Sequence, residues 1–191
     1  MRTLKLLLIL PLALSGFLMA GCETTPESEP TYEEAANDLL RFTNYLAIDT
    51  LMGRIAKPAS ASNQPSALAG AALIVATVAN VDALERSSTL GRVISEHIAS
   101  RLTQNGHGVV ELKVRNGIYM KNNEGEFLLT RQIKEVAAAH NAQGVIVGFY
   151  AQSARFVQVT LKLIDPESGL VLSAYDYTLP LDKQIRSMLR R

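Results

Sequence analysis

The chain has 191 residues, of which 48% are hydrophobic and 6% aromatic, and its formal net charge is +1. This length fits one domain with short additional segments, and the apolar fraction is typical of a folded chain rather than a disordered one. The near-neutral charge gives no reason to expect a nucleic-acid partner. The single cysteine excludes an internal disulfide and a cysteine-rich metal site.

Residues 1–21 have the three-part pattern of a secretory signal peptide. Arg2 and Lys5 provide a short positive region, and an apolar run from Leu6 to Leu18 follows it. This run is too short for a stable membrane-spanning helix, which needs about 20 apolar residues. We therefore expect the segment to be removed from the mature protein.

The end of this segment reads Met19-Ala20-Gly21-Cys22 and resembles the lipobox of bacterial lipoproteins, with Met19 where leucine is usual. In that motif small residues admit the signal peptidase, and the cysteine thiol carries a diacylglycerol. Two or three acyl chains anchor a protein stably, because each buried CH₂ contributes about 0.8 kcal/mol. We predict lipid attachment at Cys22, the alternative being an ordinary signal peptide beside an incidental cysteine. By the same resemblance, Glu23 in place of aspartate favours the outer membrane, facing the periplasm.

Cleavage before Cys22 would leave 170 residues, in which 17 Lys and Arg face 18 Asp and Glu, a net charge of −1. Residues 22–30 are polar, acidic and contain proline, so we interpret them as a flexible tether between the lipid and the domain. The folded domain is predicted to occupy residues 31–191.

The domain is predicted to begin with a helix. Thr31-Tyr32-Glu33-Glu34 fits a capping box, in which Thr31 and Glu34 satisfy each other's backbone groups. Apolar residues then recur at helical spacing, which predicts one long amphipathic helix that ends before Pro58. Its predicted apolar face comprises Tyr32, Ala36, Leu39, Leu40, Leu46, Leu51, Met52 and Ile55.

The middle of the chain alternates between strand and helix patterns. The continuous apolar run from Ala71 to Val81 predicts a strand buried on both faces. A helix capped by Ser87 or Ser88 is predicted next, with Gly106 just after its end. The following segments predict a strand at 109–114, a hairpin at 118–129 and a helix from a Thr130 cap through His140, closed by Asn141.

The C-terminal third is predicted to be mainly strands. Residues 145–150 predict a buried strand, and in 157–163 apolar residues alternate strictly with polar ones, which predicts a half-exposed strand. A turn at 165–169 leads to an antiparallel strand at 170–177 and then to a short basic helix. This order of elements implies an α/β (α+β) fold, a single small domain with a mixed sheet packed by helices.

The sequence carries no motif for catalysis or metal binding. The three histidines, His97, His107 and His140, form no metal-ligand pair with one another or with the cysteine. His107 lies between two glycines, but this G-x-G leads into a strand and not into a helix, so it does not fit a dinucleotide fingerprint. We therefore expect a protein that is not an enzyme and that binds neither a cofactor nor a metal.

Two segments are candidate interaction surfaces. The first is the polar side of the alternating strand, the alternative being an ordinary solvated sheet face; it comprises Gln158, Thr160 and Lys162. The second is the basic C-terminal helix, which we interpret as a solvated charged face, with contact to anionic lipid or a partner as the alternative. Its cations are Lys183, Arg186, Arg190 and Arg191.

The mature domain resembles the FlgO family of flagellar outer-membrane lipoproteins over roughly residues 38–177, through the order and spacing of several short segments. These are Val81-Asp82, Leu90-Gly91-Arg92, Ser95-Glu96, Val110-Glu111-Leu112-Lys113, Gly125-Glu126-Phe127, Leu129-Thr130-Arg131, Val147-Gly148-Phe149-Tyr150 and Ile164-Asp165. The resemblance implies a fold similar to CsgG-like and TolB amino-terminal modules and a non-enzymatic role in flagellar assembly, outer-membrane passage or motility. The loop around residues 57–70 departs from the family pattern.

This resemblance favours a structural or assembly role at the flagellar basal body through protein contacts, with a homo-oligomer as an open alternative. Another alternative is an envelope lipoprotein that binds and regulates a periplasmic enzyme such as a peptidoglycan synthase. Residues 23–30 span at most about 28 Å when extended, which is short for crossing peptidoglycan. A CsgG-like secretion component is a third alternative, and it would need membrane-spanning strands, whereas residues 157–163 provide one short alternating strand.

Overall fold

The computed structural model describes residues 29–53, 68, 70–83, 88–112, 118–120, 127–129 and 131–190. Cys22 and the predicted signal peptide lie outside these residues, as do Thr130, Arg191 and most of the loop around residues 57–70. The chain divides into two compact units, residues 1–36 and residues 37–191. The first unit contributes one described helix, α1 (Tyr32–Ala36), and every other described element belongs to the second.

The predicted capping box is confirmed at the start of α1. The backbone N–H of Glu34 donates to Oγ1 of Thr31 at 3.2 Å, and the N–H of Thr31 donates to Oε2 of Glu34 at 2.7 Å. The prediction of one long helix was wrong, because α1 ends at Ala36 and α2 spans Leu39–Gly53. Asp38 accounts for the break, since its Oδ1 accepts from the N–H of Leu40 at 3.0 Å and starts a new helix.

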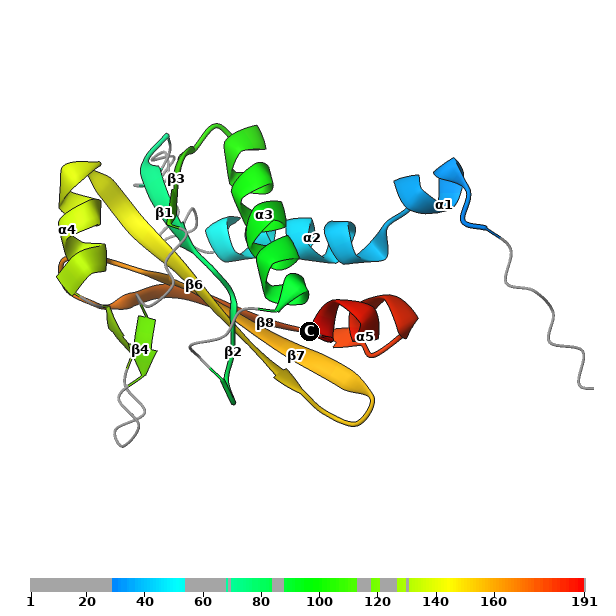
Figure 1. Ribbon diagram of the computed structural model, residues 1–191. Helices are drawn as coiled ribbons and strands as arrows, with labels where there is room; N and C mark the ends of the chain where they lie inside the picture. Colours follow the sequence, from blue (N-terminus) through cyan, green and yellow to red (C-terminus); the bar gives the residue numbers. More distant parts are fainter. Residues whose placement is uncertain are drawn as a thin grey trace, which may run out of the picture. The chain divides into compact units, whose positions relative to one another are not determined.

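The second unit contains the predicted mixed sheet, whose main strand order is β3-β1-β6-β7-β8 with β2 pairing with β6 (Figure 1). β1 is parallel to both β3 and β6, whereas β6, β7 and β8 are successively antiparallel. The strands are β1 (Ala72–Ala76), β2 (Ala79–Asn80), β3 (Gly108–Leu112), β6 (Ala142–Gln152), β7 (Phe156–Ile164) and β8 (Val171–Pro180). A separate antiparallel pair, β4 (Ile118–Met120) and β5 (Phe127–Leu129), confirms the predicted hairpin.

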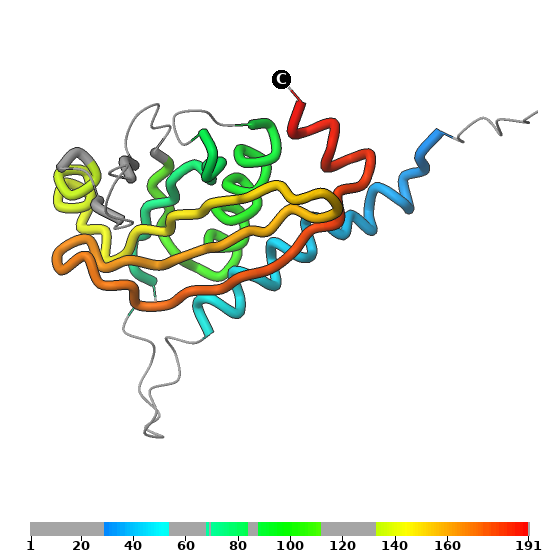
Figure 2. The backbone as a smooth tube through the Cα atoms, turned by 90° about the horizontal axis from the view of Figure 1, so that it is seen from below, coloured from blue at the N-terminus to red at the C-terminus, as the bar shows by residue number. Residues whose placement is uncertain are grey.

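Helices pack on both faces of this sheet (Figures 1 and 2). α2, α3 (Thr89–Gln104) and α5 (Lys183–Leu189) cover one face and enclose the larger core, while α4 (Arg131–Ala139) packs against β6 on the other. Along β1, Leu73 and Val75 point into the larger core, and Ile74 and Ala76 point into the smaller one. This strand is therefore buried on both faces, as the apolar run from Ala71 to Val81 predicts.

Capping residues and residues with positive φ mark several other ends of helices and strands where the sequence predicts them. Ser88 caps α3, its Oγ accepting from the N–H of Gly91 at 3.1 Å, and Gly106 follows the helix with φ of 86°. Asn141 has φ of 49° just after α4, and Gly169 has φ of 75° in the turn between β7 and β8. Residues that tolerate positive φ thus end these elements where the sequence predicts.

The apolar run from Ala71 to Val81 is interrupted at Thr77 and Val78, so it forms two strands rather than one. At this interruption the N–H of Val78 donates to Oγ of Ser95 at 2.8 Å, and that hydroxyl donates to the carbonyl oxygen of Gly91 at 2.8 Å. A Cβ atom at Gly91 would overlap the carbonyl oxygen of Val78. The missing side chain therefore lets α3 approach the sheet backbone closely enough for the Ser95 hydroxyl to bond to it.

Candidate functional site

The predicted lipid attachment residue, Cys22, lies outside the described residues, so its lipidation stays a prediction. In the described part of the chain, no group of three His, Cys, Asp or Glu side chains could hold a metal ion. Nδ1 of His107 is buried without a hydrogen-bond partner in the structure. No described helix combines the length and the apolar character needed to cross a membrane. Two exposed surfaces of the second unit are candidates for protein contacts.

The first surface is the side of β7 and β8 that points away from α2, α3 and α5. The predicted alternation is confirmed, because Val157, Val159, Leu161 and Leu163 are buried in the larger core. The polar side chains of β7 point the other way, and the register pairs them with exposed or half-exposed positions of β8. We define the open face as Gln158, Thr160, Lys162, Ala174, Asp176 and Thr178.

The open face is polar, and its margin is an edge strand. Oγ1 of Thr160 donates to Oδ1 of Asp176 at 2.6 Å across the strand pair. β8 forms the last strand of the described sheet, and apolar side chains are exposed at its beginning: Leu170 is 65%, Val171 48% and Leu172 43% exposed. An exposed apolar edge strand is a template for pairing with another chain. This end of the sheet is therefore suited to protein contacts.

A second exposed apolar surface lies on α2. Leu40, Ala47, Ile48 and Leu51 are buried, whereas Leu39, Phe42 and Leu46 are 78%, 52% and 62% exposed. Leu39 and Leu46 were predicted to be buried, and that prediction was wrong, as it was for Tyr32 in the first unit, which is 98% exposed. α2 has apolar residues on two opposite sides, and helical spacing alone does not say which side meets the sheet.

A chain of hydrogen bonds joins α2, α3 and β8. The Tyr177 hydroxyl donates to Oδ1 of the buried Asn44 at 2.6 Å, and Nδ2 of Asn44 lies 2.9 Å from Nδ1 of His97. With this amide orientation, Nδ2 of Asn44 is the donor and Nδ1 of His97 is the acceptor. Desolvation by burial lowers the pKa of His97 below its ordinary value; Asp38 opposes this shift and Arg41 adds to it. Burial also raises the pKa of Tyr177.

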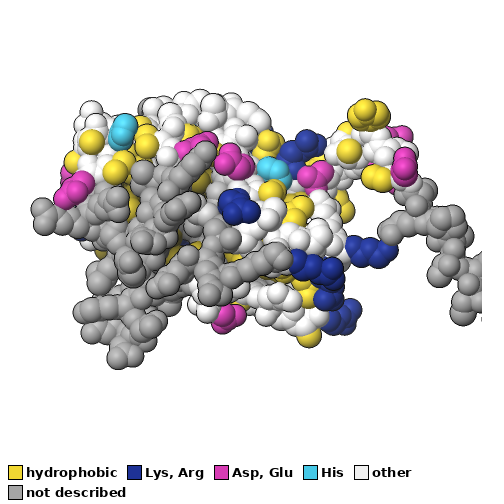
Figure 3. All heavy atoms as spheres, in the orientation of Figure 1, with side chains coloured by type: hydrophobic (Ala, Val, Ile, Leu, Met, Phe, Trp, Pro, Cys, Tyr) yellow, Lys and Arg dark blue, Asp and Glu magenta, His cyan; other side chains and the backbone are white. Residues whose placement is uncertain are grey.

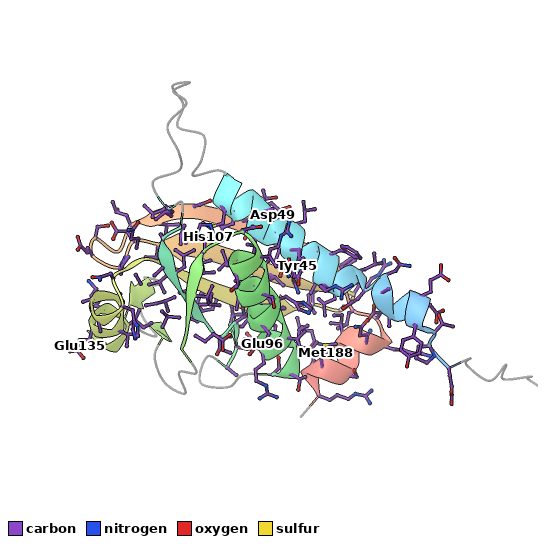
Figure 4. The ribbon with its side chains drawn as sticks, turned by 90° about the horizontal axis from the view of Figure 1, so that it is seen from above. Tyr45, Asp49, Glu96, His107, Glu135 and Met188 are labelled. Carbon is purple, nitrogen blue, oxygen red and sulfur yellow. The ribbon has the colours of Figure 1, made fainter. Side chains whose placement is uncertain are left out.

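An ion pair strengthens the contact between the same two helices. Nε and Nη2 of Arg101 donate to the two carboxylate oxygens of Asp49 at 2.9 and 2.6 Å, and Nδ2 of Asn105 donates to Oδ1 of Asp49 at 3.0 Å. The guanidinium also lies 5.3 Å from the ring centre of Tyr45. The hydrogen bond from Arg101 holds the pKa of Asp49 below its ordinary value. Figure 4 shows Tyr45 and Asp49 along α2 beside α3.

These two polar clusters join α2 to α3 and β8 and so support the packing of α2. Sequence reasoning missed both, because the partners are far apart in the chain: Asn44 and Tyr177 are separated by 133 residues. A signal was present in Asn44, a polar residue on the otherwise apolar side of α2 that contains Leu40, Ala47 and Ile48. A buried amide needs hydrogen-bond partners, which the tertiary structure supplies in His97 and Tyr177.

Acidification is expected to destabilise the folded unit through His97. Since the pKa of His97 is lowered by folding, the unfolded state binds more protons, and stability falls as the pH drops through about 6.5, the ordinary histidine value. The measurement is the urea midpoint of the wild type and of His97→Gln at about pH 7.5 and about pH 5.5. We expect the wild type to lose more stability between these values than the variant. Equal losses would contradict this role of His97.

The predicted basic helix is α5, and its described cations, Lys183, Arg186 and Arg190, are exposed. Nε of Arg186 donates to the carbonyl oxygen of Leu181 at 3.0 Å, which fixes part of this side chain over the start of the helix. Leu181 and Ile185 are buried in the larger core, so α5 is attached to the sheet by its apolar side. The cations are consequently presented outward.

Together these features describe a mixed-sheet α+β unit with exposed contact surfaces. The family model described as FlgO protein matches residues 46–184. The chain therefore belongs to the FlgO protein family, and the resemblance seen in the sequence is confirmed. The matched residues lie within the domain predicted at residues 31–191.

Several solved structures are similar to this chain at low identity. The C-terminal domain of LpoB from Escherichia coli is 15% identical with a TM-score of 0.48, over 73% of this chain and 97% of that chain. The PelC dodecamer from Paraburkholderia phytofirmans is 20% identical with a TM-score of 0.39, over 63% of this chain and 78% of that chain. Lipoprotein GNA1162 from Neisseria meningitidis is 13% identical with a TM-score of 0.40, over 60% and 83%. Among curated protein sequences, none matches this chain.

Proposed function

We propose that this FlgO-family chain is an outer-membrane lipoprotein, anchored at Cys22, with a structural or assembly role in the flagellum. Membership of the FlgO family is the observation that carries the proposal. The lipobox-like Met19-Ala20-Gly21-Cys22 supports the anchor, and the absence of aspartate directly after Cys22 favours the outer membrane over the inner one. The protein acts through protein–protein contacts on the periplasmic side, is not an enzyme and needs no cofactor.

The contact surface in this proposal is the open face together with the edge of β8. Two features support this choice. The buried residues of β7 pack in the larger core, so the polar residues of the open face lie on a strand whose other side is covered. The exposed Leu170, Val171 and Leu172 add apolar area beside the edge of β8, which a strand of a basal-body or other envelope protein can extend.

A deletion strain of a flagellated host tests the proposed role. We expect loss of swimming in soft agar and basal bodies with incomplete outer-membrane passage by electron cryotomography. Wild-type protein should restore both, whereas Cys22→Ala should not, because without acyl chains the protein leaves the outer-membrane fraction. A deletion strain that swims and assembles flagella normally would disprove the flagellar role. Outer-membrane fractionation of Cys22→Ala would disprove the anchor.

Two matched variants in the same strain separate the open face from the rest of the surface. Thr178→Lys places a long cation on the open face, and Ser100→Lys places one on the exposed side of α3. We expect Thr178→Lys to abolish co-purification with flagellar components and Ser100→Lys to retain it, both proteins being folded. Identical behaviour of the two variants would exclude the open face. Co-purification of a peptidoglycan synthase in place of flagellar components would favour the regulatory alternative.

A further inference from the structure

One end of the sheet combines exposed cations with exposed apolar side chains. α2 begins there, β6 turns into β7 there, and β8 passes into α5 (Figures 1 and 2). Two contacts fix this arrangement: the Ser173 hydroxyl donates to the carbonyl oxygen of Leu51 at 2.9 Å, and the Tyr177 hydroxyl donates to Asn44. α2 and β8 are therefore antiparallel, and the start of α2 lies beside the end of β8.

The β6–β7 hairpin and α5 meet at the same end. Phe156, the first residue of β7, pairs with Pro180, the last residue of β8. The N–H of Leu181 donates to the carbonyl oxygen of Arg155 at 2.9 Å, which joins the hairpin to the segment that leads into α5. Residues that are far apart in the sequence, at positions 39–42, 155–156 and 183–190, thus share one end of the unit.

We define the docking end as Leu39, Phe42, Arg155, Phe156, Lys183 and Arg190. Phe156 is 45% exposed, in addition to Leu39 and Phe42 on α2. Guanidinium groups lie over both phenyl rings, Arg41 at 5.5 Å from the ring centre of Phe42 and Arg155 at 5.7 Å from that of Phe156. Figure 3 shows dark blue Lys and Arg side chains gathered over α5.

Two carboxylates at the docking end, those of Asp38 and Asp182, accept hydrogen bonds from backbone N–H groups at the starts of helices. Oδ1 of Asp182 accepts from the N–H of Ile185 at 2.8 Å and caps α5, and Asp38 accepts from the N–H of Leu40 at the start of α2. In the three segments that meet at this end, residues 38–42, 155–156 and 182–190, five cations accompany these two acids, a local excess of positive charge. They are Arg41, Arg155, Lys183, Arg186 and Arg190.

We infer that the docking end rests on the anionic phospholipid surface of the membrane that holds the lipid of Cys22. The inference rests on the proposed anchoring. Each Lys or Arg held near an anionic bilayer surface strengthens association about fivefold, and exposed phenyl and leucyl side chains enter the boundary between headgroups and acyl chains. The docking end presents both kinds of group together, whereas the open face is polar and holds Asp176.

The covalent chain brings the docking end, rather than the opposite end, to the membrane. Asp38 lies 16 residues after Cys22, a length of at most roughly 45 Å when the five residues of α1 are helical. The turn between β7 and β8 lies at the other end of β7, a further nine residues or roughly 30 Å away. An anchored domain also has a high effective concentration at its own membrane, so weak contacts are sufficient.

The test uses the full lipidated protein in vesicles, labelled with an environment-sensitive fluorophore. Ser187→Cys places the label on α5, and Glu167→Cys places it in the turn at the opposite end. We expect a blue shift for Ser187→Cys on vesicles with about 30% phosphatidylglycerol in phosphatidylethanolamine, and none on neutral phosphatidylcholine vesicles. Salt at about 0.5 M should reverse the shift, because it screens the charges. Glu167→Cys should show no shift on either membrane.

Charge reversal provides a matched control. Lys183→Glu with Arg190→Glu, in the Ser187→Cys protein, should lower the ratio of docked to undocked protein at least tenfold. Lys134→Glu with Gln143→Glu and Ser100→Glu changes the net charge by the same amount at exposed positions elsewhere, and it should leave this ratio unchanged. The inference would be overturned by a fluorescence shift that is independent of phosphatidylglycerol, or by equal shifts in the two sets of charge variants. An acidic protein segment would then be the better candidate partner of the docking end. A missing lipid anchor can be distinguished from a docking end that does not contact the membrane, because a protein without the anchor would not float with vesicles of any composition.

Discussion

Gly91→Ala is expected to lower the free energy of unfolding by about 3 kcal/mol, the upper part of the range for overpacked positions. The added methyl group would overlap the backbone carbonyl oxygen of Val78 and would lie 3.4 Å from Cε1 of Tyr150. A backbone atom cannot rotate away as a side chain does. The hydrogen bond between Val78 and Ser95 also ties the two segments together, so relieving the overlap would weaken that bond.

Gly53→Ala is the control for this prediction. Gly53 is the last residue of α2, and a Cβ atom there would meet nothing within 4 Å. Alanine has the higher helix propensity, so this variant should be as stable as the wild type or more stable by up to about 1 kcal/mol. Urea unfolding followed by far-ultraviolet circular dichroism measures both variants. A Gly91→Ala protein as stable as Gly53→Ala would show that the α3 contact with Val78 is not close-packed.

Leu161→Ala is expected to cost about 2–5 kcal/mol of unfolding free energy. Leu161 is fully buried at the centre of β7, between the helices and the sheet. It lies opposite Gly148 of β6, and a Cβ atom on Gly148 would be 2.8 Å from Cδ2 of Leu161 and 2.7 Å from Cγ2 of Val78. The leucine side chain therefore occupies space that the glycine leaves free, and its truncation leaves a cavity.

A double-mutant cycle distinguishes this packing from a general loss of hydrophobicity. Gly148→Ala should be destabilising alone and less so in the Leu161→Ala protein, where the added methyl group occupies part of the cavity. The exposed Leu172→Ala should change stability by less than about 0.5 kcal/mol. Strict additivity of the two core substitutions would show that Leu161 does not pack over Gly148.

The features that the sequence predicted correctly depend on local chemistry. The Thr31–Glu34 capping box and the Ser88 cap involve groups within three residues of each other, so a short segment contains all the information. Alternation in β7 likewise follows from the period of an extended strand, since only one side of β7 meets the helices. The family resemblance combined such segments in order, and the family match confirms it.

The failed helix prediction also has a local cause. The helical spacing of the apolar residues continues on both sides of Asn37 and Asp38. An Asn or Asp side chain, however, competes with the helix for the backbone N–H groups that follow it. Asp38 does so by bonding to the N–H of Leu40. Apolar periodicity and capping chemistry therefore predict different structures at this position, and the cap at Asp38 determines the outcome.

By itself, the sequence determined the mixed sheet, the family and the order of helices and strands except for two divisions, that between α1 and α2 and that between β1 and β2. Only the tertiary structure decided which side of α2 is buried, because Leu40 and Leu46 are equally apolar and their surroundings come from β8 and α3. Packing also formed the Asn44–His97–Tyr177 chain. In the sequence, the acidic residues lie near Cys22 and the basic ones at the far end of the chain. Antiparallel packing of α2 against β8 returns α5 to the start of the second unit, so distance along the chain does not predict which charges lie beside the start of α2.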